Sequence, residues 1–429
     1  MPHNADYQPD ESFAIRCDRD DPLSRFRDRF HIPLRSDGRP VIYFAGNSLG
    51  LQPKGVRERV LQELDDWAAL GVDGHFRGET PWYSYHEIFR ESGARLVGAQ
   101  SGEVVMMNSL TVNLHLMMTT FYRPIGAKNK VLMVYPAFPS DTYAVKTHLR
   151  SRGVDPNESL IVAKSREGEQ LLRDDDIESV ITRDADDLAL VLLDGVNYFT
   201  GQAFDLPCLA TVAQRNGVVF GLDLAHAAGN IPLSLHGWGV DFAVWCNYKY
   251  LNSGPGAVAG CFVHEKHGKQ SELPRLAGWW GNDPDTRFRM HLQPEFIPRL
   301  GADGWQVSNP PILSLAPVRA SLDLFDEAGM AALRAKSEQL TGYLMYLIDG
   351  LSAEGFEIIT PREPRRHGCQ ASIVVKDRAR ERFDALHAEG VVCDFREPNV
   401  IRVAPVPLYN TFHEVWRFAQ ILAKQHRQG

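Results

Sequence analysis

Short apolar segments alternate with helix-like segments between residues 103 and 263, and this rhythm constrains the fold more than any other feature of the chain. Four of the apolar segments carry no alternating polar residues and lie at 104–107, 131–135, 188–193 and 218–222. Such runs are typical of a parallel sheet that helices cover on both faces. Further strands are expected at 242–246 and 257–263, and Gly254 and Gly256 predict a turn into an antiparallel edge pair. The expected fold class is therefore α/β.

A second unit is expected beyond Pro310 and Pro311. Residues 312–351 predict one or two long amphipathic helices that end near glycines. A compact α+β pattern follows, with strands at 371–375 and 400–403 and helices at 378–387 and 412–424. We therefore expect an N-terminal segment that packs on the small domain, a large domain, and linking helices with a small C-terminal domain, at residues 1–50, 51–310 and 311–429.

The composition argues against several classes of function. The chain has 46 basic and 54 acidic side chains, a net charge of −8 and no run of lysine or arginine, so it lacks the electrostatic footprint for nucleic acid or anionic membranes. No segment approaches the length of a membrane span, and the polar residues 1–13 predict no signal or transit peptide. Six cysteines without a C-x-x-C pair favour neither a disulfide framework nor a zinc site, and predict a cytoplasmic location.

A carboxylate and a lysine follow two of the expected strands. Asp223 and His226 lie where the strand at 218–222 stops, and Lys249 follows the strand at 242–246. The carboxyl edge of a parallel sheet is where ligands bind, so these side chains should converge there. Pyridoxal phosphate enzymes use such a pair, because lysine forms a Schiff base with the aldehyde and a carboxylate keeps the pyridine nitrogen protonated. A surface lysine and a helix-capping aspartate remain the alternative.

Two further segments at strand ends are candidates for binding the rest of such a cofactor. Leu110 and Thr111 begin a helix after the strand at 104–107, and a helix N-terminus offers backbone N–H groups to a phosphate. Serine and threonine also cap helices that bind no ligand, so this motif alone is weak. Phe138 follows the strand at 131–135 and offers an aromatic face for stacking, although an aromatic residue there is often core.

These segments, in this order, resemble the kynureninase family of pyridoxal-phosphate enzymes. The resemblance covers nearly the whole chain and rests on YFAGNSLGLQPK, GHFRGETPW, NSLTVNLHLMM, FPSD, FTGQ, GLDLAHAAGN, CNYKYLNSGPG, LAGWWGN, VSNPPIL and NVIRVAPVPLYN. It implies the fold of the aspartate aminotransferase group, fold type I. In that fold a large domain with a mainly parallel, seven-stranded type of sheet binds the cofactor, and a smaller α+β domain lies at the C-terminus.

The resemblance also implies cofactor-binding roles. Lys249 corresponds to the lysine that binds the cofactor covalently, and Asp223 to the partner of its pyridine nitrogen. Tyr248 would help to hold the phosphate and act as a candidate acid or base. The other implied cofactor contacts within the same chain are Leu110, Thr111, Phe138, Pro139, Ser140, Asp141, Asp194 and His226. Asp194 is a departure, because a small hydroxyl residue is expected there, and a carboxylate near a phosphate is repulsive unless it is paired.

The remaining implied residues concern the substrate and a second subunit. Arg402 resembles the arginine that binds the substrate α-carboxylate, a task that suits its bidentate fork. Ser48, His75 and Asn309 resemble residues around the aryl ring. Trp279 and Asn309 resemble cofactor contacts that come from the other subunit of a homodimer.

The implied reaction is hydrolysis of the Cβ–Cγ bond of L-kynurenine or 3-hydroxy-L-kynurenine, in tryptophan catabolism. It gives anthranilate or 3-hydroxyanthranilate and L-alanine. His75, Ser308 and Asn309 resemble groups that meet the ring hydroxyl of the second substrate, and such groups discriminate strongly. The alternative is that Ser308 and Asn309 only cap the turn before Pro310. The sequence therefore leaves open which of the two substrates is preferred.

Other functions compete with this one. A cysteine desulfurase or an aminotransferase would share the lysine and the carboxylate, and a desulfurase also needs a cysteine nucleophile, for which Cys369 in a polar turn is the candidate. A non-catalytic relative would keep the fold without the reaction. A metal hydrolase is disfavoured, because His264 and His267 lack an H-E-x-x-H pattern and are expected to be solvated, so no metal is predicted.

Overall fold

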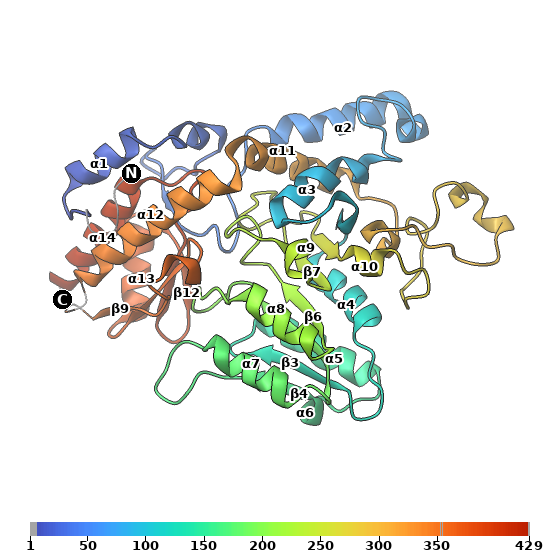
Figure 1. Ribbon diagram of the computed structural model, residues 1–429. Coiled ribbons are helices and arrows are strands. Elements are labelled where there is room, and N and C mark those ends of the chain that lie inside the picture. The colour runs from blue at the N-terminus through green and yellow to red at the C-terminus, as the bar shows by residue number, and fades with distance from the viewer. Residues whose placement is uncertain (1–6, 352, 354, 428–429) are drawn as a thin grey trace.

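The computed structural model describes residues 7–351, 353 and 355–427, and its larger part is built around one seven-stranded sheet (Figure 1). The strands, in spatial order, are β2 (Val104–Met106), β8 (Gly260–Val263), β7 (Phe242–Trp245), β6 (Val219–Asp223), β5 (Leu188–Asp194), β3 (Lys130–Val134) and β4 (Leu160–Ala163). Strands β7, β6, β5, β3 and β4 pair in parallel, and β8 runs antiparallel to both of its neighbours. The mainly parallel sheet expected from the sequence is thus present.

Two details of the sheet differ from the expectation. Strand β8 is antiparallel as predicted, but the prediction of an edge position is wrong, because β2 pairs with its outer side. The edge strand β4 was not predicted at all. It has only four residues, LIVA, and follows directly on a one-turn helix, α6 (Pro156–Ser159), so it has no long apolar run of its own.

Helices cover both faces of this sheet because alternate residues of its strands point to opposite sides. Leu190 and Leu192 of β5 belong to a cluster with α4 (Leu110–Phe121) and α5 (Pro139–Ser151). Val191 and Leu193 belong to the larger cluster on the other face, and the helices there include α3 (Arg90–Val97), α7 (Asp174–Arg183) and α8 (Leu206–Arg215). The fully apolar strands that the sequence showed are explained by this double cover.

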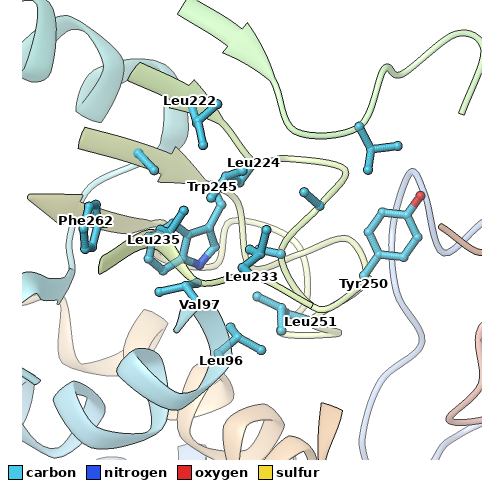
Figure 2. Close-up of a cluster of buried hydrophobic side chains, with 14 of the residues drawn as sticks. Leu96, Val97, Leu222, Leu224, Leu233, Leu235, Trp245, Tyr250, Leu251 and Phe262 are labelled. Carbon is cyan, nitrogen blue, oxygen red and sulfur yellow. The ribbon is translucent and has the colours of Figure 1, made fainter. Parts of the chain in front are cut away.

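One part of the larger cluster surrounds Trp245, the last residue of β7. Figure 2 shows Trp245 at its centre, with Leu222 and Phe262 from the neighbouring strands and Leu96 and Val97 from α3. All five side chains are buried. The segment after Trp245, which carries Lys249, therefore leaves a rigidly packed strand end.

The C-terminal part has its own four-stranded antiparallel sheet. Its strands, in spatial order, are β12 (Asp394–Arg396), β13 (Val400–Val403), β10 (Ala371–Val375) and β9 (Phe356–Ile358). The helices of this part are α12 (Met330–Asp349), α13 (Ala379–Ala388) and α14 (Phe412–Arg427), and α11 (Ile312–Ala328) precedes them. The predicted helical stretch at 312–351 is thus two helices, divided at Gly329, whose φ of 75° breaks the first helix.

The N-terminal segment packs on this C-terminal part. Helix α1 (Glu11–Arg19) contacts α14, and Phe13 shares a hydrophobic cluster with Tyr343 of α12 (Figure 1). Strand β1 (Ile42–Tyr43) pairs in parallel with β11 (Val391–Val392). Helix α2 (Val56–Leu70) packs instead on α11. The domain boundaries given above stay a prediction.

Shorter helical elements complete the described chain: α9 (Leu235–Trp238), α10 (Glu265–Gly268) and the 3-10 helices at 24–29, 71–75, 85–89, 101–103, 287–292, 302–305 and 364–366. Within the described ranges, no helix combines the length and the apolar composition that crossing a membrane requires. Residues 1–6 of the polar N-terminal segment, on which the prediction of no signal peptide partly rests, lie outside the described residues.

Candidate active site

One cavity at the carboxyl edge of the seven-stranded sheet collects most of the predicted site residues. Its lining consists of Leu110, Thr111, Phe138, Ser140, Asp141, Asp194, Val196, Tyr198, Asp223, Ala225, His226, Tyr248 and Lys249. Strands β5 and β6 end at Asp194 and Asp223, and Lys249 follows β7. The expected convergence of the lysine and the carboxylate on one edge is thus seen.

Lys249 is one of the residues that line this cavity. Its Nζ is 2.9 Å from Nε2 of His226, and Nδ1 of His226 is 3.4 Å from the hydroxyl of Tyr250. Burial and the nearby Lys249 charge lower the pKa of His226 far below its ordinary value. His226 is therefore a neutral imidazole that accepts a hydrogen bond from the lysine.

Three buried carboxyl groups face the lysine. Asp194 and Asp223 are register partners on β5 and β6, and Asp141 from the first turn of α5 is hydrogen-bonded to Asp223. Burial raises the pKa of all three groups, and the repulsion of Asp223 raises that of Asp141 and Asp194 further. Among the three, the surroundings of Asp223 favour the ionised form, because Asp141 and the backbone N–H of Ala225, at 2.7 Å, donate hydrogen bonds to it.

The unexpected Asp194 points toward the cavity and not away from it. Its Oδ2 accepts a hydrogen bond from Nδ2 of Asn197 at 3.2 Å, and the side chain is buried. The same Asn197 nitrogen donates to the backbone oxygen of Pro136 at 2.8 Å. Asp194 is therefore held next to Asp223 by the sheet register and by one amide.

Two helix N-termini meet on the opposite wall. Thr111 lies in the first turn of α4 and Ser140 in the first turn of α5, and their hydroxyl oxygens are 3.3 Å apart. Paired hydroxyls at two positive helix ends suit a phosphate. Phe138, the residue before α5, has its ring centre 5.7 Å from Nζ of Lys249, so a planar ring between them would be stacked.

Tyr248 completes the wall beside the lysine, and Cys246, two residues earlier in the chain, is one of the groups that act on its hydroxyl. Burial and the neighbouring Cys246 and carboxylates raise the pKa of Tyr248 well above its usual range. The phenol therefore keeps its proton at neutral pH. Cys246 was not predicted as a site residue, because a cysteine at a strand end looks like core.

Arg402 is buried on β13, in the C-terminal part of the chain, yet it reaches this cavity through Tyr198. Its Nη1 donates to the backbone oxygen of Tyr198 at 2.5 Å, and its Cζ is 5.9 Å from the Tyr198 ring centre. Its Nε donates to Asp394 on β12 at 2.8 Å. Sequence reasoning missed Tyr198 and Asp394, although Tyr198 directly precedes the segment FTGQ.

Besides Arg402, five of the predicted residues do not line the cavity in one chain. Ser48 and Asn309 are exposed, His75 is half-buried with its ring 5.5 Å from that of Trp82, and Trp279 is 39% exposed. Pro139 begins α5 just outside the lining. Their assigned roles stay predictions.

The cysteine that a desulfurase would need is not available. Cys369 is buried, its backbone N–H donates to Asn230 at 2.8 Å, and burial raises the pKa of its thiol to about 12. The expectation that it lies in an exposed polar turn is wrong, because the turn is covered by the segment around Asn230. A thiol that is buried and protonated cannot serve as the nucleophile on a mobile loop that a desulfurase requires.

Comparison with known proteins gives a consistent family. The family model described as the kynureninase C-terminal domain matches residues 333–422. The kynureninase of Koribacter versatilis (strain Ellin345) is 54% identical over 97% of this chain and 98% of its own length. That of Myxococcus xanthus (strain DK1622) is 53% identical over 98% and 99%, and that of Xanthomonas oryzae pv. oryzae (strain PXO99A) is 55% identical over 94% and 96%.

Solved structures share the fold at much lower identity. The apo cysteine desulfurase from Thermococcus onnurineus NA1 has a TM-score of 0.74 at 18% identity, over 95% of this chain and 98% of that one. A cysteine desulfurase from Escherichia coli has the same TM-score at 15% identity, over 95% and 98%. These structures confirm the fold class expected from the sequence, fold type I. The identity shared with its full-length relatives decides the family, and the chain belongs to the kynureninase family.

Proposed function

We propose that this chain is a hydrolase that cleaves the Cβ–Cγ bond of L-kynurenine, or of 3-hydroxy-L-kynurenine, with water. The products are anthranilate or 3-hydroxyanthranilate and L-alanine. The observation that carries this proposal is the identity of about 54% to kynureninases over nearly the whole chain, together with Lys249, His226 and Asp223 in one cavity.

The cofactor that fits this cavity is pyridoxal phosphate. The cavity offers one lysine, a carboxylate stabilised as an ion, an aromatic face and two hydroxyls at helix ends, which match the aldehyde, the pyridine nitrogen, the ring and the phosphate. Lys249 and Asp223 would hold the reactive parts, with Phe138 on the ring and Thr111 and Ser140 at the phosphate. When bound, the cofactor supplies an electron sink for negative charge at the substrate α-carbon.

The chain's own residues divide the proton transfers between them. Nζ of Lys249 removes the proton from Cα of the substrate and returns it later, and His226 orients that nitrogen from 2.9 Å without competing for its role as base. Asp223 would keep the pyridine nitrogen of the bound cofactor protonated. Tyr248, which keeps its proton, would donate it to Cβ of the substrate when the Cβ–Cγ bond breaks, and would regain a proton from the water that adds to the acyl carbon.

Arg402 is proposed to bind the α-carboxylate of the substrate. Replacing it by alanine, Arg402→Ala, should raise KM about 100-fold, since hydrogen bonds to a charged group contribute roughly 1.5–3 kcal/mol. Cofactor affinity, measured by titration of the absorbance, should stay nearly constant. An unchanged KM would remove Arg402 from this role.

We further propose a homodimer in which Trp279 and Asn309 reach the cavity of the second copy. Residues 276–300 project from the body of the chain (Figure 1) and carry exposed apolar side chains, among them Leu276, Phe288 and Leu292. Surfaces of this kind are typical of interfaces between subunits. A cofactor-loaded protein that sediments as a fully active monomer would contradict this proposal.

The cytoplasm is the proposed compartment, and it is supported by the six cysteines, all of which are free thiols.

The first experiment is a steady-state comparison of L-kynurenine and 3-hydroxy-L-kynurenine with the purified protein and pyridoxal phosphate, in which alanine release is measured. Cleavage of either substrate supports the reaction, and the ratio of kcat/KM shows whether the ring hydroxyl is recognised. Cofactor binding without cleavage of either substrate would contradict the proposed function.

A further inference from the structure

The environment of Arg402 decides which edge of its guanidinium is free. Arginine has five N–H donors, and two of them are taken: Nε by Asp394 Oδ1 at 2.8 Å and one on Nη1 by the backbone oxygen of Tyr198 at 2.5 Å. Among the described residues, Nη2 has no hydrogen-bond partner. The side chain is 1% exposed, so these free donors are not spread into bulk water.

A carboxylate can bind arginine through either of two parallel pairs of N–H groups, Nε with Nη2 or Nη1 with Nη2. Asp394 occupies Nε and therefore closes the first pair. The second pair is still open, because Nη1 keeps one free hydrogen and Nη2 keeps both. A single bidentate position for a ligand carboxylate is thus left, and it lies next to the backbone of Tyr198, which lines the cavity of Lys249.

The sheet register holds Asp394 in this place. Asp394 and Arg402 are direct cross-strand partners on β12 and β13. A second arginine, Arg396, approaches the same carboxylate, with Nε 2.9 Å from Oδ1 and Nη2 donating to Oδ2 at 3.2 Å. One carboxylate between two guanidinium groups leaves a net charge of +1, which a substrate carboxylate can balance.

Resting on the function proposed above, we propose that Asp394 is a positioning residue of the substrate site, which clamps Arg402 so that only its Nη1–Nη2 edge receives the α-carboxylate. Without the clamp, only the backbone oxygen of Tyr198 holds the guanidinium by a hydrogen bond, and Arg396 repels it. The geometry thus assigns to Asp394 an effect on ligands that carry an α-carboxylate and none on ligands that lack it.

The test uses the cofactor-loaded enzyme with two ligands. L-kynurenine carries the α-carboxylate, and kynuramine, its analogue without that group, serves as a competitive inhibitor. Asp394→Ala should raise KM for kynurenine about 10- to 100-fold, with kcat changed less than about threefold and the inhibition constant of kynuramine unchanged. Asp394→Asn, which keeps an oxygen acceptor for Nε, should show a smaller rise. Asp377→Ala, which removes an exposed carboxylate of the same domain, is the control and should change neither.

A double mutant separates the clamp from a general structural role. In the Arg402→Ala background, Asp394→Ala should raise KM no further, because the residue acts through Arg402. An equal loss of affinity for kynurenine and kynuramine, or an additive loss in the double mutant, would overturn the proposal. If Arg402→Ala itself leaves KM unchanged, or if the wild type cleaves neither kynurenine, it is the proposed function that fails, and that result is distinct from a failure of the Asp394 clamp.

Discussion

Two polar clusters, each built around buried carboxyl groups, lie at opposite edges of the seven-stranded sheet, and they are built on different principles. The site cluster, defined as Asp141, Asp194, Asp223, His226 and Lys249, lies at the carboxyl edge. The support cluster, defined as Gln100, Glu103, His236 and His264, lies at the amino edge, where β2 begins and the antiparallel β8 ends.

In the support cluster, both carboxylate oxygens of Glu103 accept hydrogen bonds. Oε1 of Glu103 accepts from Nδ1 of His236 at 2.9 Å and from the backbone N–H of Glu265 at 2.7 Å, and Oε2 accepts from the backbone N–H of Gln100 at 2.8 Å. The Gln100 side chain donates to the other nitrogen of His236, and the His264 ring stacks on it at 4.9 Å. These contacts join three loops, so this cluster stabilises the fold.

The site cluster gathers three carboxyl groups around one lysine, so like charges are crowded and carboxyl pKa values are raised. Such crowding lowers stability, and it persists where a ligand needs it. The difference teaches that burial alone does not mark a functional group. What marks it is burial with unbalanced charge beside a cavity.

The largest effect is expected for Lys249→Ala. We expect kcat/KM for kynurenine to fall at least about 1,000-fold, because the residue that moves the Cα proton is lost. Borohydride treatment should no longer fix the cofactor to the chain, as mass spectrometry would show, while the Tm changes little. A variant that still retains reducible cofactor would show that another lysine carries the chemistry.

Asp223→Asn should have the next largest effect on activity. Loss of the negative charge opposite the lysine should lower kcat about 100-fold, as for other groups that stabilise charge in a transition state. Stability of the cofactor-free protein, measured by thermal unfolding, should not fall, because a crowded carboxylate is removed. A large drop in Tm would place Asp223 with the support cluster instead.

Glu103→Ala should lower the stability of the protein and leave its activity nearly unchanged. It leaves partly buried N–H donors without their acceptor, and because a fully buried unsatisfied group costs roughly 1–3 kcal/mol, the urea midpoint and the Tm should fall. Turnover by the folded fraction should stay within about twofold of the wild type, and Glu103→Gln should lose less stability. If turnover collapses while stability holds, the division into two kinds of cluster is wrong.

The smallest effect is expected for Asp194→Asn, which should make the cofactor-free protein more stable against unfolding. The folded pKa of Asp194 is raised, so the folded state binds more protons than the unfolded state, and stability falls as pH rises from about 4 through the folded pKa. Replacing the carboxylate should remove this loss, by about 1.4 kcal/mol for each unit of the pKa shift. Unfolding curves at pH 5 and pH 8 should therefore differ less in the variant. An unchanged pH dependence would contradict the crowding of the site cluster.

The sequence predicted the chemistry of the site better than its surroundings. Lys249, Asp223 and Thr111 each sit at the end of a local apolar pattern, so their shared edge followed from the parallel sheet. Asp394 and Tyr198 escaped notice because neither lies in a distinctive pattern, and both matter only through Arg402. His264 and His267 were expected to be solvated, yet His264 stacks on His236 and Nε2 of His267 lies 2.7 Å from Asp241.

The sequence by itself determined the α/β class, the strand ends that carry the chemistry and the family, because these depend on residues that are close along the chain. Only the tertiary structure decided that Asp194 faces Asp223, that Cys369 is sealed and that Asp394 restrains Arg402. Burial and electrostatic pairing depend on distances in space, and residues from remote segments set them. The charge state of the site is for this reason a property of the folded chain.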